Sequence, residues 1–194
     1  MKAILTSTLG IIMACCAPQS ARAWNNSGHM LIATIAYNGL SAPEQGQVNE
    51  VLKSHPKYTA WSAAYNSASQ VPLGLYVFMQ ASGWADEVRN YSEPATHANW
   101  HFIDYPLRPP RFSYRAAFAP NDNAVVGIRT LRRTLDDPHQ GAQAQAEELA
   151  FIVHFIGDIH QPLHCATLIN STFSDPSEGD RGGNHFRVKM QANS

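Results

Sequence analysis

The segment from Phe151 to His164 holds the side chains of this chain best suited to chemistry. His154 and Asp158 are four residues apart, so they share one face of a helix. Their neighbours are mostly apolar, which predicts a helix that is buried on nearly every side. A buried ionisable pair is costly unless it is compensated, and zinc compensates it because imidazole and carboxylate are standard zinc ligands. Pro162 then ends the helix, which lets His164 approach the pair at a different angle.

The same spacing has an ordinary explanation. A His/Asp pair four residues apart is most often a surface ion pair, but the apolar flanks of this one argue against exposure. Three other histidines, His55, His97 and His139, lie in polar, turn-like stretches, where we expect solvated side chains.

The first 23 residues are typical of a secretory signal peptide. Lys2 supplies a basic start, residues 3–17 are mostly apolar, and Ala21-Arg22-Ala23 is a small-x-small cleavage site. The apolar run is too short and interrupted to span a membrane. A lipoprotein processing site at Cys15 is a weaker alternative. We therefore predict a protein that is secreted or periplasmic after cleavage between Ala23 and Trp24.

Cleavage at that point would leave 171 of the 194 residues and a free α-amino group on Trp24. That amine and the Trp24 carbonyl oxygen can chelate a metal, and His29 follows about one turn later. Only Cys165 would remain of three cysteines, which excludes an internal disulfide. Twelve basic and 15 acidic residues would leave a net charge of about −3, so a polyanionic substrate would depend on bound metal for positive charge.

The chain is predicted to fold as one mainly α-helical domain over residues 24–194, without repeats or long linkers. Ser41, Pro43 and Glu44 form a capping box with an early proline, which predicts a helix start. Helices are predicted over residues 29–40, 41–54, 71–89, 123–135 and 143–159, and a short strand or extended loop over 181–190.

Six short segments, in this order, resemble the S1/P1 family of secreted zinc-dependent nucleases, whose fold is related to bacterial phospholipase C. The segments are Trp24-Asn-Asn-Ser-Gly-His29, Gly83-Trp84-Ala85-Asp86-Glu87, Trp100-His101-Phe102-Ile103-Asp104, Val153-His154-Phe155-Ile156-Gly157-Asp158, Gln161-Pro162-Leu163-His164 and Gly182-Gly183-Asn184. Each motif is weak alone, but six in order are specific. The resemblance implies a single-domain helical bundle of the phospholipase C/nuclease type with three zinc ions in a cleft.

The resemblance also implies a ligand set. One zinc would take Asp86, His101, His154 and Asp158. A second would take the Trp24 amine and carbonyl oxygen, His29 and a shared Asp158. His164 would be the first ligand of a third zinc.

The third site departs from the family pattern. Its other two ligands come from a His-x-x-x-Asp motif downstream of Gly182-Gly183-Asn184, and no such motif follows here; His185 is the only later histidine. We therefore expect a member of the family that lacks the C-terminal part, with two complete zinc sites and a third that lacks ligands.

The implied reaction is hydrolysis of phosphodiester bonds in single-stranded DNA and RNA, leaving 5′-phosphates. Asp104 is expected to orient the attacking water or a group that supports the metal ligands. Arg89 is expected to contact the phosphoryl oxygens, with a salt bridge to Glu87 or Glu93 as an equal alternative.

Two further residues are expected to bind substrate. Phe102 would stack on an unpaired base, with a core phenylalanine as the alternative. Asn184 would hydrogen-bond a base edge, or it would serve only the turn made by the two preceding glycines. We expect a monomer with a single-stranded nucleic acid substrate, no protein partner and no stable membrane association.

Other functional classes remain open at this point. The chain could be a phospholipase C-like phosphodiesterase, a truncated zinc-binding remnant without turnover, or an exported helical domain without metal. The aromatic segment from Phe112 to Phe118 contains Arg115 and directly follows Arg111, and it does not separate the lipid enzyme from the nuclease.

Overall fold

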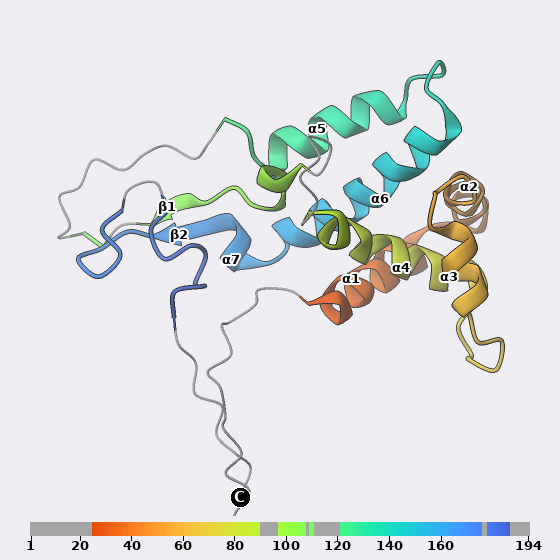
Figure 1. The fold of residues 1–194 in the computed structure, drawn as a ribbon, viewed down its shortest axis with the longest axis horizontal. Helices are drawn as coiled ribbons and strands as arrows, with labels where there is room; N and C mark the ends of the chain where they lie inside the picture. The colour runs from red at the N-terminus through yellow and green to blue at the C-terminus, as the bar shows by residue number, and fades with distance from the viewer. Residues whose placement is uncertain (1–24, 90–96, 108, 111–120, 176–177, 187–194) are drawn as a thin grey trace, which may run out of the picture.

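The computed structural model describes residues 25–89, 97–107, 109–110, 121–175 and 178–186, and these are mainly helical (Figure 1). This confirms the predicted fold class. The helices are α1 (Asn26–Gly39), α2 (Ala42–Leu52), α3 (Tyr58–Ala64), α4 (Leu73–Val88), α5 (Ala124–Leu135), α6 (Ala142–Ile159) and α7 (Pro162–Cys165), with a 3-10 turn, η2 (Ala98–His101). The strands are β1 (Tyr105–Leu107) and β2 (Ala166–Leu168).

Short polar side chains fix several helix starts. Asn25 accepts a hydrogen bond from the Gly28 N–H at the start of α1, and Asn123 does the same for Val125 at the start of α5. At α2, the Glu44 carboxylate accepts bonds from the backbone N–H and the hydroxyl of Ser41, as expected for a capping box. The predicted helices are present with small shifts at their ends, whereas α3 and the short α7 were not predicted.

The core of the bundle lies around α4 and α6. Helix α4 packs against α1 and α6, and α5 packs on the other side of α6. Phe155 on α6 is fully buried, and burying such a side chain contributes roughly 1.5–3 kcal/mol. The large buried side chains of this cluster are Tyr37, Leu52, Trp61, Leu75, Phe78, Trp84, Leu131, Phe151 and Phe155. These apolar contacts fix α1, α4 and α6, the three helices that carry most of the predicted metal ligands.

A short parallel β-ladder ties two distant parts of the chain together. Tyr105 pairs with Ala166 and Leu107 with Leu168. The Ile103 N–H also donates to the His164 carbonyl oxygen at 2.8 Å. The segment after η2 is therefore held against the segment after α7, at the opposite end of the molecule from α2 and α3 (Figure 1).

The region near the C-terminal end of the chain differs from the predicted strand or extended loop. Residues 179–185 form successive turns, because Arg181, Gly182 and Gly183 all have positive φ. Residues 187–190 of the predicted segment lie outside the described residues, as do residues 1–23 and Trp24. No described helix is both long and apolar enough to cross a membrane.

Candidate metal centre

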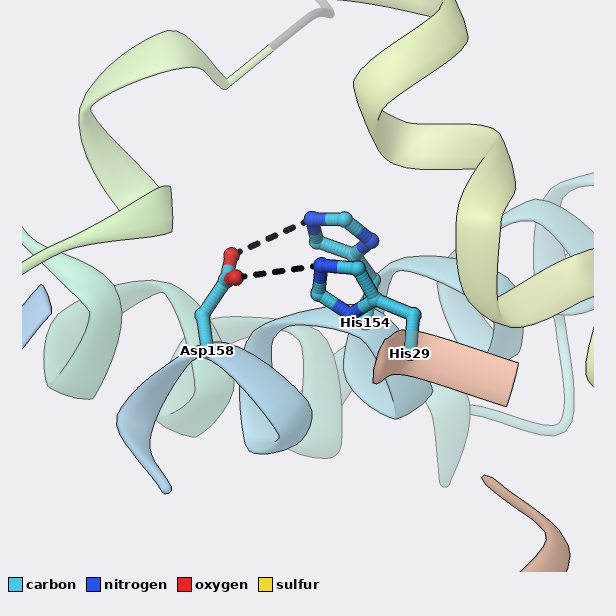
Figure 2. A group of neighbouring side chains, drawn as sticks. All are labelled: His29, His154 and Asp158. Carbon is cyan, nitrogen blue, oxygen red and sulfur yellow. Dashed lines mark ion pairs between the residues drawn. The ribbon is translucent and has the colours of Figure 1, made fainter. Parts of the chain in front are cut away.

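Six predicted ligands converge from five elements of the bundle. Figure 2 shows three of them, with the Asp158 carboxylate facing the rings of His29 and His154. The six are His29 from α1, Asp86 from α4, His101 from η2, His154 and Asp158 from α6, and His164 from α7. The seventh predicted ligand, Trp24, lies outside the described residues.

Four of these side chains form a first group with the spacing of a tetrahedron. His154 Nε2 and His101 Nδ1 are 3.0 Å apart, and each lies 3.1 Å from Asp158 Oδ2. Asp86 Oδ1 lies 3.7 Å from the His101 nitrogen and 3.8 Å from the His154 nitrogen. Ligands at about 2.0–2.2 Å from a tetrahedral zinc are roughly 3.3–3.6 Å apart, so these five distances suit one zinc ion.

The carbonyl oxygen of Ser82 fixes the tautomer of His154. His154 Nδ1 lies 2.6 Å from this oxygen, which can only accept, so Nδ1 carries a proton. In the neutral ring Nε2 then has a lone pair, and it faces an oxygen of Asp158 that has no hydrogen-bond partner despite its burial. Two electron-rich atoms at this distance are best compensated by a cation. A histidine that donates its other ring N–H to a backbone carbonyl is also the usual arrangement for a metal ligand.

A second group forms on the other oxygens of the same carboxylates. His29 Nε2 lies 3.5 Å from Asp158 Oδ1 and 3.9 Å from Asp86 Oδ2. His164 Nε2 lies 3.7 Å from the same Asp158 oxygen. Each carboxylate therefore faces both groups, which is an arrangement suited to two neighbouring cations.

Close packing of α1 on α6 places His29. Its ring stacks on that of His154, with centroids 3.9 Å apart and an interplanar angle of 17°. A Cβ on Gly157 would lie only 3.1 Å from His29 Nδ1, so the glycine leaves room for the ring. His29 is thereby buried at the interface of the two helices.

The protonation of the cluster also favours a cation. Burial and the neighbouring His154 lower the pKa of His29 to about 4, against the attraction of Asp158 and Asp86. Burial alone would raise the pKa of Asp158, but contacts with His101 and His154 lower it below its usual value. Burial likewise lowers the pKa of His101 and His164, whereas contacts with the carboxylates outweigh burial and raise that of His154. The Asp158 carboxylate is thus ionised beside three imidazoles, those of His29, His101 and His164, that burial keeps neutral, and these are the forms that bind metal.

The four predicted catalytic and substrate-binding residues line one cavity next to His164. It encloses about 230 Å³, and the predicted residues in its wall are Arg89, Phe102, Asp104 and Asn184. Burial and the nearby Asp180 raise the pKa of Asp104 to about 6, against the opposing charge of Arg181. A carboxyl group that titrates near neutral pH in a cavity is suited to accepting a proton.

The contacts of these residues bear on the alternatives left open by the sequence. The Arg89 guanidinium lies 5.9 Å from the centroid of the Phe102 ring, within cation–π range, while Glu87 pairs with Lys57 instead. Phe102 is half-buried in the cavity wall and not part of the core cluster. The Asn184 side chain donates to the Arg181 carbonyl oxygen at 2.7 Å, so it stabilises the turn while it lines the cavity.

Sequence reasoning missed three contributors to this region. Ser82 acts through its backbone carbonyl, for which no side-chain pattern exists. Glu178 and Arg181 also line the cavity, and only the position of Arg181 directly before the two glycines could have indicated its role. His185 is exposed and packs near Phe173, and it belongs to neither ligand group described above.

The whole of residues 24–194 matches the model of the S1/P1 nuclease family, and the chain belongs to that family. Among curated proteins, it is 29% identical to nuclease P1 of Penicillium citrinum over 73% of this chain and 47% of that protein. It is 28% identical to endonuclease 1 of Arabidopsis thaliana over 82% of this chain and 49% of the relative. Nuclease S1 of Aspergillus oryzae is 26% identical over 73% of this chain and 44% of the relative. The chain thus spans about half the length of the curated relatives it matches.

Proposed function

We propose that this protein is an exported zinc-dependent nuclease that hydrolyses phosphodiester bonds of single-stranded DNA and RNA and leaves 5′-phosphates. The observation that carries the proposal is the tetrahedral spacing of Asp86, His101, His154 and Asp158 beside a cavity lined by Arg89. Family membership and the names of the relatives support a nuclease.

The first zinc would be held by the four residues of the tetrahedral group. The second would be held by His29 and the far oxygen of Asp158, together with the amine and carbonyl oxygen of Trp24 after cleavage of the signal peptide. His164 would belong to the third zinc of the family. Bound zinc supplies positive charge for the phosphate and lowers the pKa of a nearby water.

The chain's own residues would act around the bound phosphate. Arg89 would donate hydrogen bonds to its oxygens, where negative charge develops during attack. Asp104 would accept a proton on its carboxylate from the attacking water. Phe102 would stack on an unpaired base, which favours single strands because a paired base has no free face in the duplex stack. We propose that the protein acts as a monomer outside the cytoplasm.

The test uses the chain that begins at Trp24, purified and analysed for zinc per molecule, with cleavage of end-labelled single-stranded DNA measured in parallel. Zinc binding with cleavage to 5′-phosphate ends supports the proposal. Zinc binding without cleavage contradicts it and leaves a metal-binding protein. Hydrolysis of phosphatidylcholine, but not of DNA, would assign a lipid substrate instead. A folded chain without zinc would refute the ligand set.

A further inference from the structure

A second arginine lines the cavity from a segment that the proposed reaction does not use. Arg89 enters from the end of α4, whereas Arg181 enters from the turn that follows β2. The cavity wall also carries Phe102, Asp104 and His164. Glu178 lines the same cavity, so the two arginines share its wall with two acidic residues.

The turn that carries Arg181 is anchored to β2. The Asp180 carboxylate accepts hydrogen bonds from the Leu168 N–H at 2.8 Å and from the Thr167 hydroxyl at 3.2 Å. Asp180 is itself buried, and the Thr167 hydroxyl also lies 2.8 Å from the Glu178 carbonyl oxygen. The residues on either side of Gly179 are thus held firmly on the strand.

The same turn is anchored to α7 on its other side. Gly182 packs so closely on Leu163 that a Cβ would overlap the Leu163 carbonyl oxygen. Arg181 has φ 51°, a left-handed conformation that is unfavourable for a residue with a side chain. The anchored turn holds Arg181 in this conformation at the cavity wall.

The Arg181 guanidinium is available for a ligand. Arg181 is exposed, and within the part of the chain that the structure describes no carboxylate oxygen lies within 4.0 Å of its nitrogens. The charge of Arg89 acts on His101 and His164, whereas that of Arg181 acts on Asp104. The two arginines therefore act on different residues of the cavity wall, Arg89 on two of the predicted metal ligands and Arg181 on Asp104.

We infer that Arg181 binds a phosphate that neighbours the scissile one, so that the cavity recognises two successive phosphates of a single strand. This inference rests on the proposed nuclease function. Arginine suits the role because its planar group donates paired hydrogen bonds to phosphate oxygens. The arrangement makes the enzyme prefer substrates longer than a dinucleotide.

The test compares thymidine dinucleotide TpT, which has one phosphate, with the trinucleotide TpTpT, which has two. For Arg181→Gln we expect KM for TpTpT to rise about tenfold, as for loss of a charge-assisted hydrogen bond, with kcat nearly unchanged. KM for TpT should change less than about twofold by the same reasoning. Arg181→Lys should recover part of the loss, and Arg129→Gln, an exposed arginine on α5, should change neither substrate.

The inference is overturned if Arg181→Gln raises KM equally for TpT and TpTpT, or lowers kcat for both. Arg181 would then contact the scissile phosphate or only stabilise the turn. Direct titration with both oligonucleotides in the presence of zinc separates this result from failure of the proposed function. If the wild type binds TpTpT more tightly than TpT and cleaves neither, the nuclease proposal fails, and the effect of Arg181→Gln on that difference still decides the inference. If it binds both equally, the second phosphate site does not exist.

Discussion

His154 and Asp158 lie one turn apart on α6, and their Nε2 and Oδ2 atoms are 3.1 Å apart. The Ser82 carbonyl oxygen holds the other nitrogen of the ring, so the lone pair of Nε2 cannot turn away from the carboxylate. Both side chains are almost completely buried. A helix that packs its apolar residues on α4 and α5 thus presents a fixed nitrogen and oxygen to one point, and metal ligands are usually oriented in this way before the metal binds.

Asp158→Asn should remove zinc from the protein. Asp158 faces both ligand groups with different oxygens, and asparagine keeps its shape but loses the charge. We expect zinc affinity to fall at least about 100-fold, because even residues that only support a ligand account for 10–100-fold. Metal analysis after dialysis against a defined zinc concentration measures this, with the exposed Asp136→Asn as the control. Unchanged zinc content would contradict the assignment.

Removal of metal should lower the stability of the fold. Without a cation, the buried Asp158 carboxylate and the partly exposed Asp86 carboxylate meet several buried imidazoles. Binding stabilises the native state by about 4 kcal/mol when free zinc is about 1,000 times Kd. Thermal unfolding with a chelator should therefore show a lower Tm, restored by added zinc but not by magnesium, which prefers octahedral oxygen sites. A Tm independent of zinc would mean that the cluster is satisfied without metal.

Activity should fall in acid through the titration of Asp104. Its pKa is raised to about 6, mainly by burial, so the carboxylate that accepts a proton is present above that pH and is lost below it. The rate kcat should decrease as pH falls through about 6. The Asp104→Asn variant should have a much lower kcat at every pH, and its kcat should not decrease further in acid. The exposed Asp137→Asn should still show the decrease in acid. If kcat of Asp104→Asn still decreases through about pH 6 as in the wild type, the titration belongs to another group.

The sequence predicted most of the helices and the ligands because both depend on local patterns. Caps at Ser41 and Asn123 and the apolar flanks of His154 are readable within a few residues. The spacing of His29, Asp86 and His101 in the sequence does not predict that they converge, because contacts between separate helices bring them together. Only the resemblance to a family predicted it.

Other features depend on tertiary contacts that a local pattern cannot reveal. The strands β1 and β2 have three residues each, and they pair although α5, α6 and α7 lie between them in the sequence. His55 was predicted to be solvated because its neighbours are polar, and this is wrong: it is 3% exposed, since Trp61 and Trp84 pack on its ring. His139 is exposed as predicted.

Phe102→Leu should weaken binding of single strands without unfolding the protein. Phe102 is only half-buried in the cavity wall, and Arg89 lies over its ring. Loss of one stacked base costs about 1–3 kcal/mol, so KM for single-stranded DNA should rise roughly 5- to 150-fold. Phe186→Leu provides a matched control, because Phe186 is an exposed phenylalanine that does not line the cavity. Equal effects of the two substitutions would argue against a stacking role for Phe102.

His55→Phe should reduce the loss of stability in acid. His55 is buried against two tryptophans with its Nε2 unpartnered, and burial lowers its pKa to about 4 from 6.5. Because the folded pKa lies below the unfolded one, protonation favours the unfolded chain, and stability is full above pH 6.5 and falls as pH drops toward 4. Screening by solvent limits this contribution between about pH 7 and 5 to the order of 1 kcal/mol. Urea unfolding at both pH values, with the exposed His139→Phe as control, should show the smaller decrease only in His55→Phe.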